Sequence, residues 1–545
     1  MRTFETAALL LLCLSCGGGD QHSKSHPKPE QGLAGEAGAN GSAGAGDAVG
    51  GSSASSPDGG ASGRPAESAG NAGEAGSPGE GGGAGEALLP DEPDNGTLSG
   101  SRLKAEWYDF GGTRVFADFY DTMLDAPCTP GPWSDGKIYC IPVSTATLGY
   151  TTNACAEAEM LGYFRFNAAC QHPSPAYLVL AADSSPCGAA SAHVYRLSAT
   201  ATALTQYYAL QNGGCSGPYS TGYGNSDTFP VTGEVMPPEL VEFTREAPTD
   251  PGRISRQYMV AADGARLAIA PHDSELDADC SLKTALADPS QGSCPPTDTR
   301  DVVFYTDMDC KQGVVSAPMA CPKPALAREP VDRGCSQSGS NYYQVGDTIA
   351  KPASAWVGGT TACVASSVSS GNTVYALGDP VTVQQLSRAH DSIAGRNVQP
   401  IYFSDGKKRF LDQNLYDTAH ETECQPYVLP DGTIVCVPFG ASASAFYEET
   451  CTSFIHVGLV YFGLDRCNAP PPLPAFITSP YVAASGCSPG FEIDERGPQY
   501  TGKGYLKGGS DTCTIYTGLE PFHFFELGAV HPFSEFPTAT LVRDK

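Results

Sequence analysis

The chain has 545 residues, of which 60 are acidic and 32 basic, so its formal net charge is −28. A field of this sign repels phosphate groups, which argues against a nucleic-acid-binding protein and against one that docks on anionic membrane surfaces. The remaining composition, with 63 glycines and 20 cysteines, suits an exported protein that combines disulfides with flexible segments.

Residues 1–16 have the pattern of a lipoprotein export signal. Arg2 gives the positive end, residues 7–14 form a short apolar core, and the small residue Ser15 precedes Cys16. The core is too short to span a bilayer, so we predict a signal peptide at 1–15 that is removed. Acyl chains on Cys16 would then hold the protein in a lipid bilayer almost permanently. The alternative is an ordinary secretory signal that releases a soluble protein.

Residues 16–100 comprise the lipidated cysteine and a linker rich in Gly, Ala and Ser. Between 17 and 100 the sequence holds no Phe, Tyr, Trp, Ile or Met. Such a stretch cannot bury enough apolar surface to offset about 1–2 kcal/mol of backbone entropy per residue, so we predict that it is disordered. A flexible coil of this length has a typical span of about 50 Å, which lifts a folded domain clear of the membrane.

The cysteines after the signal fall into three sets of six. The first two gaps are 12 and 15 residues in the first and third sets, and 14 and 16 residues in the second. The sets are Cys128, Cys140, Cys155, Cys170, Cys187, Cys215; Cys280, Cys294, Cys310, Cys321, Cys335, Cys363; and Cys424, Cys436, Cys451, Cys467, Cys487, Cys513. In an oxidising compartment such sets form disulfides, and the sequence does not choose among the 15 connectivities that six cysteines allow. Zinc is the competing use, but the gaps match no usual structural zinc site.

One pairing can be examined by counting residues. If Asp135-Gly136 is a two-residue hairpin turn, Cys140 faces position 131 and not Cys128. A bond between the first and second cysteine would therefore need an irregular strand.

Other residues recur with the cysteines. An Asp stands seven residues before the first cysteine of each set, at Asp121, Asp273 and Asp417, and a Gly marks a turn upstream of each. We expect these Asp side chains to accept backbone hydrogen bonds at a strand end, the alternative being a functional acid. The period of about 145–150 residues predicts three repeats within one closed domain. The repeats span 101–248, 249–392 and 393–545.

Each repeat reads as short strands between turn signals, without a long helical period, so the predicted fold class is all-β. Residues 103–108 and 114–120, for example, flank the hairpin signal Gly111-Gly112. We favour a six-bladed β-propeller with two blades per repeat. Three tandem β-sandwich or β-barrel domains are the alternative.

The sequence offers no catalytic residue and implies no cofactor. One metal candidate exists, since Asp273, Glu275, Asp277 and Asp279 alternate along an expected strand and would place four carboxylates on one face. Calcium takes clustered oxygen ligands of this kind. A solvated acidic face is the competing explanation, because the other repeats lack the pattern.

The signal, the linker and blocks such as Tyr120-Asp121 and Cys140-Ile-Pro142 resemble a class of predicted myxobacterial lipoproteins with a Gly/Ala/Ser-rich tether and cysteine-rich β repeats. The likeness spans nearly the whole chain, although the second copy departs with His272 in place of Tyr. The resemblance implies an outer-membrane lipoprotein of the cell envelope, periplasmic or surface-exposed. It implies no established activity, so it transfers no site residue.

Two functional hypotheses follow from these observations. The first is a non-catalytic binding or scaffold module with a protein or polysaccharide ligand. The second is an extracellular polymer-degrading hydrolase with acids at the centre of a propeller. A central pocket lined by converging charged residues would favour the enzyme, and a shallow or plugged channel would favour the binding module.

Overall fold

The chain was analysed as a computed structural model. It describes residues 96–144, 146–165, 175–181, 192–202, 204–211, 214–220, 226–248, 252–285, 288–332, 338–358, 363–438, 441–461, 473–479, 491–507, 513–515 and 522–545. Over these residues the protein is all-β, as predicted, with three short 3-10 turns and no α-helix. Among them, no helix has the length and apolar character needed to cross a membrane. The predicted signal peptide, Cys16 and the linker up to residue 95 lie outside this part of the chain.

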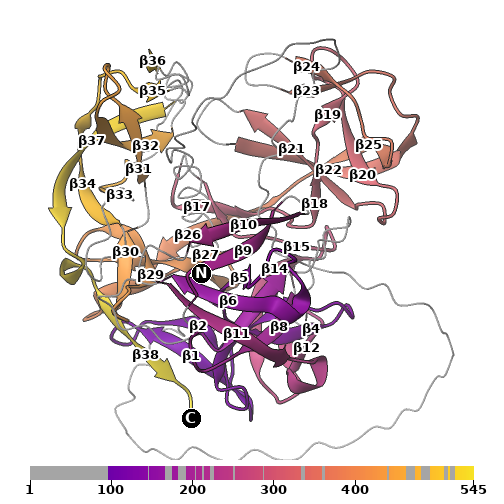
Figure 1. The fold of residues 1–545 in the computed structure, drawn as a ribbon. Helices are drawn as coiled ribbons and strands as arrows, with labels where there is room; N and C mark the ends of the chain where they lie inside the picture. The colour runs from indigo at the N-terminus through magenta and orange to yellow at the C-terminus, as the bar shows by residue number, and fades with distance from the viewer. Residues whose placement is uncertain are drawn as a thin grey trace, which may run out of the picture.

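Sixteen strands form one large sheet, which we call the hub (Figure 1). Its strands are β1 (Leu103–Asp109), β2 (Arg114–Asp121), β3 (Ala126–Pro132), β4 (Ile138–Pro142), β12 (Glu242–Arg245), β13 (Ile254–Ala261), β14 (Arg266–Asp273), β15 (Ala278–Asp279), β16 (Lys283–Thr284), β17 (Gln291–Cys294), β26 (Gln384–His390), β27 (Val398–Ser404), β28 (Arg409–Asp417), β29 (Thr422–Val428), β30 (Ile434–Pro438) and β38 (Thr538–Arg543). Their order in the sheet is β15-β14-β13-β12-β4-β3-β2-β1-β38-β30-β29-β28-β27-β26-β17-β16.

The hub closes on itself. Its two end strands, β15 and β16, follow each other in the chain, and a bridge between Cys280 and Pro296 lies next to them. The Cys280–Pro296 bridge continues the antiparallel register of β16 and β17, in which Lys283 faces Ser293. The segment from β15 to β16 therefore pairs with β14 on one side and with the β17 segment on the other, so the sheet has no free edge there. Closure removes the exposed strand edges that promote aggregation.

The hub consists of three units with the same strand order. Unit 1 contains β1 to β4 and β12, unit 2 contains β13 to β17 and β26, and unit 3 contains β27 to β30 and β38. The last strand of each unit pairs with the first strand of another unit, through β12–β13, β26–β27 and β38–β1. The first hairpin of each unit has a register shift within one residue of the same place, after Ala105, Ser255 and Pro400. Because such bulges bend a strand, each unit curls into a half-barrel.

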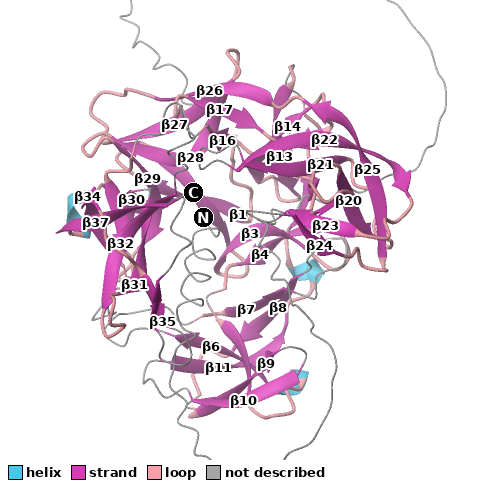
Figure 2. Cartoon of the chain, turned by 90° about the horizontal axis from the view of Figure 1, so that it is seen from above, coloured by secondary structure: helices cyan, strands magenta, loops and turns pink. Residues whose placement is uncertain are grey.

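Before its last hub strand each unit carries a separate β-sheet, which we call a lobe. Figure 2 shows the three lobes spread around the hub. Lobe 1 holds β5 (Thr147–Tyr150), β6 (Met160–Arg165), β7 (Tyr177–Ala181), β8 (Ala192–Leu197), β9 (Gln206–Gln211), β10 (Gly214–Ser220) and β11 (Ser226–Glu234), with η1 (Glu157–Glu159) and, after β11, η2 (Pro237–Glu239).

The other two lobes are built in the same way. Lobe 2 holds β18 (Thr299–Asp301), β19 (Phe304–Tyr305), β20 (Gly313–Pro318), β21 (Leu326–Asp332), β22 (Ser338–Ile349), β23 (Ala355–Gly358), β24 (Cys363–Ser366) and β25 (Asn372–Val381). Lobe 3 holds β31 (Ala441–Tyr447), β32 (Phe454–Tyr461), β33 (Phe476–Ser479), β34 (Glu492–Gln499), β35 (Tyr505–Lys507), β36 (Cys513–Ile515) and β37 (Phe522–His531), followed by η4 (Phe533–Glu535).

The six-bladed propeller expected from the sequence is not what the described residues show. Propeller blades are separate four-stranded sheets arranged radially. Here the strands of successive units are hydrogen-bonded edge to edge, and the sheets hold 16, 7, 8 and 7 strands. The sequence identified the strands and turns, but the partner of each unit's last strand is chosen by tertiary contacts.

The hub hairpins also interlock. The turn after β1 lets Thr113 Oγ1 donate to the carbonyl of Val398 at 2.7 Å. The turn after β13 places Asp263 Oδ2 2.6 Å from the backbone N–H of Leu103. The turn after β27 brings Lys408 Nζ to 3.2 Å from the carbonyl of Ile254. The first turn of each unit is therefore hydrogen-bonded to the start of the first strand of another unit, and these bonds hold the three half-barrels in a ring.

Candidate functional site

A disulfide lies in the core of each half-barrel. The bonds join Cys128–Cys140, Cys280–Cys294 and Cys424–Cys436, and all six sulfur-bearing residues are fully buried. The expectation that Cys140 faces position 131 is wrong. The turn is one residue longer, since Trp133 bonds to Lys137, so Cys140 faces Pro130. Pro130 lies two residues from Cys128 on the same strand, and side chains two residues apart point to the same face of a sheet. Cys128 and Cys140 therefore lie on the same face, and a regular strand accommodates the bond.

A second disulfide closes part of each lobe. Its bonds are Cys155–Cys215, Cys310–Cys363 and Cys451–Cys513, which join the third and sixth cysteine of each set. The first cysteine of each pair has a positive φ, between 48° and 53°. Of the other six, Cys321 is also disulfide-bonded. Cys170, Cys187, Cys335, Cys467 and Cys487 lie outside the described residues.

The recurring Asp of each unit is a buried charge. Asp121, Asp273 and Asp417 are all fully inaccessible to solvent. Each ends the second hub strand and accepts backbone N–H groups from the turn that follows, for example from Met123 to Asp121 at 2.9 Å and from Ala419 to Asp417 at 2.9 Å. The predicted role of these residues at a strand end is confirmed.

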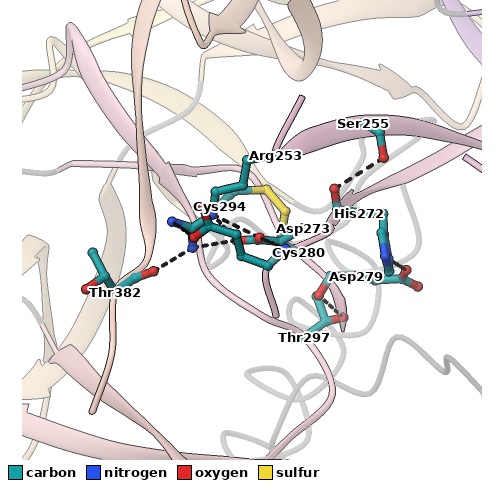
Figure 3. Close-up of a disulfide and its surroundings, with 10 residues drawn as sticks. Arg253, Ser255, His272, Asp273, Asp279, Cys280, Cys294, Thr297 and Thr382 are labelled. Atoms are coloured by element: carbon teal, nitrogen blue, oxygen red, sulfur yellow. Dashed lines mark hydrogen bonds and ion pairs between the residues drawn. A yellow bond between two sulfur atoms is a disulfide. The ribbon is translucent and has the colours of Figure 1, made fainter. Parts of the chain in front are cut away.

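In units 1 and 2 an arginine neutralises this buried carboxylate. Arg102 lies 2.7 and 2.6 Å from the two oxygens of Asp121, and Arg253 lies 2.9 and 2.8 Å from those of Asp273 (Figure 3). The same guanidinium groups donate to the carbonyls of Glu239 and Thr382, which lie just before the last hub strand of their units. The hydrogen bond to Asp273 raises the pKa of Arg253. Each arginine thus ties the first strand, the second strand and the return from the lobe together.

In unit 3 the buried aspartate has a different partner. Asn397 stands before its first strand, where the other units have arginine. The partner of Asp417 is His420, whose Nδ1 lies 2.6 Å from Oδ2. The guanidinium group of units 1 and 2 is therefore replaced by an imidazole ring at a fully buried carboxylate.

The calcium candidate does not form one face. Residues 274–277 are a turn between β14 and β15, so the four carboxylates diverge. Asp273 and Glu275 both contact Arg253, while Asp279 contacts Arg245 at 2.7 Å. Asp277 is exposed. In the part of the chain that the structure describes, no group of three or more His, Cys, Asp or Glu side chains is placed to hold a metal ion.

The junctions between units carry two cavities. One of about 500 Å³ lies between units 1 and 2 and is lined by Arg102, Lys137, Glu242 and Asp263 among others. Its charges are already engaged, because Lys137 contacts Glu242 at 2.8 Å and Asp263 accepts from the backbone of Arg102. The hydrogen bond from Lys137 to Glu242 raises the pKa of Lys137. The other cavity, of about 400 Å³, lies between units 3 and 1 and is lined by Asn397, Glu535 and Phe536 among others.

A cluster of three charged side chains lies on β26, β28 and β29. Arg388 is almost fully buried and contacts Asp412 at 2.7 Å and Glu423 at 2.6 Å. Burial raises the pKa of the Asp412 carboxyl, although Arg388 opposes this rise. Both acids are thus held by one cation, an arrangement that stabilises a fixed geometry and leaves neither carboxylate unpartnered.

Comparison with known proteins assigns the chain to a family. Residues 89–536 match a family of unknown function, DUF7481. The chain belongs to this family. The match begins ahead of the described residues and ends just before β38, so the DUF7481 region spans the three lobes and all of the hub except its last strand. No curated protein and no solved structure gives a significant match.

Sequence reasoning missed several residues in the DUF7481 region. Arg102 and Arg253 stand 19 and 20 residues before the buried Asp of their units, and this spacing could have found them. Arg388 was missed as well. It contacts Glu423 of β29 as Arg245 of β12 contacts Asp279 of β15, and the recurring separations of 35 and 34 residues could have found this pair. The buried aspartates and the cysteines were found because they recur.

Proposed function

We propose that the protein is an exported lipoprotein of the cell envelope, anchored in the outer membrane by acyl chains on Cys16, and that its folded part is a non-catalytic binding or scaffold module. This proposal includes the relationship to myxobacterial-type lipoproteins and a disordered tether between anchor and hub. The tether would carry the module on the periplasmic or the outer side of that membrane, where it could contact a protein or a polysaccharide.

We further propose that the three units and their lobes arose as internal repeats at 101–248, 249–392 and 393–545. Support comes from equal details that no local sequence rule enforces. Asp125, Asp277 and Glu421, each four residues after the buried Asp, all have φ near +50°. Such values are rare outside glycine, so their recurrence in three turns favours common descent.

The observation that carries the scaffold proposal is the state of the charged groups at the cavity between units 1 and 2. Arg102 is committed to Asp121 and Glu239, Lys137 to Glu242, and Asp263 to backbone N–H groups. Groups that already hold one another stabilise the junction and are poorly placed to move protons on a substrate. The hydrolase alternative draws on the raised pKa of Asp412, but Arg388 clamps that carboxyl.

The anchor is tested by expressing the full chain with Cys16→Ala and fractionating the cells. The variant should leave the membrane fraction and fail to incorporate a labelled fatty acid, whereas a Cys13→Ala control should do neither. Membrane retention of Cys16→Ala would refute the anchor. Binding is tested with the folded protein on immobilised envelope polysaccharides, with turnover of the same polymers measured in parallel; turnover would favour the hydrolase.

A further inference from the structure

Strand β24 is the last strand of the sheet in lobe 2, at the end of the lobe that points away from the hub (Figure 1). It pairs with β23 on one side, from Ala355 facing Ser366 to Gly358 facing Cys363. Among the residues that the structure describes, no strand or bridge pairs with its other side. An edge of this kind directs the N–H and C=O groups of every second residue away from the sheet, where an added strand can bond to them.

The side chains of β24 do nothing to block this edge. After the partly buried Cys363 come Val364, Ala365 and Ser366, which are all exposed, and the exposed fraction of Val364 is 62%. Proteins usually protect strand edges with charged side chains, proline or bulges, because an open edge invites pairing with another chain. The four residues of β24 contain no charge and no proline, and their pairing with β23 has no register shift.

Two comparable edges are protected. The opposite end of the same sheet is β18, which carries Arg300 and Asp301, the latter in an ion pair. In lobe 1 the strand with the sixth cysteine is β10, which also ends its sheet, but it contains Pro218 and has a register shift after Ser216. The counterpart in lobe 3, β36, has three residues. Strand β24 thus takes the place of β10 without either of the features that block β10.

A row of apolar side chains leads from the core of lobe 2 to this edge. Val314 of β20 faces Phe304 of β19, which in turn faces Val357 of β23. Val357 faces Val364 of β24. Exposure rises along the row, from the buried Val314 through the partly buried Phe304 and Val357 to Val364. Because side chains that face each other on neighbouring strands pack together, an apolar residue of an added strand would continue the row and cover Val364.

Both ends of β24 are fixed. Its first residue, Cys363, is disulfide-bonded to Cys310 in the turn between β19 and β20. Two residues after its last residue, Val368 is buried in the core that also holds Val314 and Val374. A strand that is already held in place loses little conformational freedom when a second strand pairs with it, so less of the binding free energy is spent on ordering.

The charges of the protein favour a basic ligand. The turn that the disulfide joins to β24 carries Asp307 and Asp309, and Lys311 lies 3.3 Å from Asp309, whose side chain is 64% exposed. The whole chain has a net charge of −28. A field of this sign repels an acidic segment and attracts a basic one.

We propose that β24 of lobe 2 binds an extended, basic segment of a partner protein by strand addition, with an apolar side chain of that segment against Val364. In this mode of recognition the backbone hydrogen bonds supply affinity and the alternating side chains supply specificity. The proposal rests on the binding role proposed above, whose ligand it narrows to a protein segment, and it is independent of the anchor at Cys16.

The probe is a fluorescently labelled peptide of alternating Val and Lys, titrated with the full chain and followed by anisotropy. It should bind, and a peptide of alternating Val and Glu should bind about tenfold more weakly. Two further peptides carry N-methyl groups, on the valines in one and on the lysines in the other. Because alternate N–H groups of a strand point to opposite sides, one of them should lose about tenfold in affinity and the other should bind as before. Equal binding of the two methylated peptides would overturn strand addition.

A pair of variants locates the site. Val364→Lys puts a charge on the edge and should weaken binding of the Val/Lys peptide about tenfold. Leu210→Lys is the matched control, because Leu210 is 53% exposed and lies in the equivalent hairpin of lobe 1, and it should leave binding unchanged. Equal weakening by the two variants would contradict a site at β24. If a variant fails to fold, the methylated peptides still decide with the wild-type protein.

Two other results would also count against the proposal. Sedimentation of the wild-type protein and Val364→Lys tests a second copy of the chain as the occupant, and self-association that Val364→Lys abolishes would replace the partner protein by that copy. The same preparation is assayed on envelope polysaccharides. Polysaccharide binding without peptide binding would refute the site at β24 and leave the binding module standing.

Discussion

Ser99 and Asp544 lie side by side although 445 residues separate them, with Ser99 Oγ 2.8 Å from Asp544 Oδ2. The contact joins the start of the described chain to its end, next to the pairing of β1 with β38. Because β38 also pairs with β30 of unit 3, the last strand completes the hub. The hub is therefore a ring in which every unit depends on two neighbours.

The interlock between units can be tested at Thr113, which is buried and donates to Val398. Thr113→Val keeps the shape of the side chain but leaves the Val398 carbonyl without this donor. We expect a loss of about 1–2 kcal/mol in the free energy of unfolding, measured by denaturant titration. Thr232→Val is the control, because the Thr232 hydroxyl bonds at the exposed surface. Equal losses in the two variants would contradict the interlock.

The buried aspartates should be far more sensitive than their exposed neighbours. Asp273→Asn removes the charge that neutralises Arg253, and breaking a buried pair in this way costs about 3–5 kcal/mol. Asp277→Asn, four residues on, changes an exposed carboxylate and should stay within about 0.5 kcal/mol of wild type. Thermal unfolding of both variants gives the comparison. A small effect at Asp273 would show that the pair is not structural.

The disulfides predict a specific peptide map. Non-reducing digestion should recover Cys128 with Cys140 and Cys155 with Cys215, together with the matching pairs of the other two sets. Elimination within each set then leaves the fourth and fifth cysteines to pair. Replacing Cys128 and Cys140 together by Ala should cost about 3 kcal/mol of stability, since the bond closes a short loop. A peptide that links two different sets would disprove this map.

The raised pKa of Asp494 predicts a pH-dependent gain on its removal. The folded pKa is about 6 and the ordinary value near 3.8, so the ionised group costs stability above pH 6 and almost none near pH 4. Asp494→Asn should therefore stabilise the protein at pH 7 by roughly 2–3 kcal/mol and leave it unchanged at pH 4. Thermal unfolding at the two pH values measures the difference. Glu495→Gln, an exposed carboxylate on the same strand, is the control. An equal gain from Asp494→Asn at both pH values would rule out titration as the cause.

Local signals in the sequence determined much of this protein. The Gly111-Gly112 turn with its flanking alternation gave the first hairpin, which the structure places at β1 and β2. The spacing from each recurring Asp to its cysteine located the end of the second strand and its turn in all three units. These features were predictable because turn geometry, strand alternation and short spacings depend on residues close in the chain.

Only the tertiary structure decided which strands pair between units and which side chains neutralise the buried aspartates. A turn one residue longer than expected put Cys128 and Cys140 on the same face, and strand parity is lost by any error of one residue in counting. The pairing of β1 with β38 and the partners of Asp121, Asp273 and Asp417 join segments that no local pattern connects. Burial converts those partners from surface charges into structural ones, and burial is a property of the folded chain.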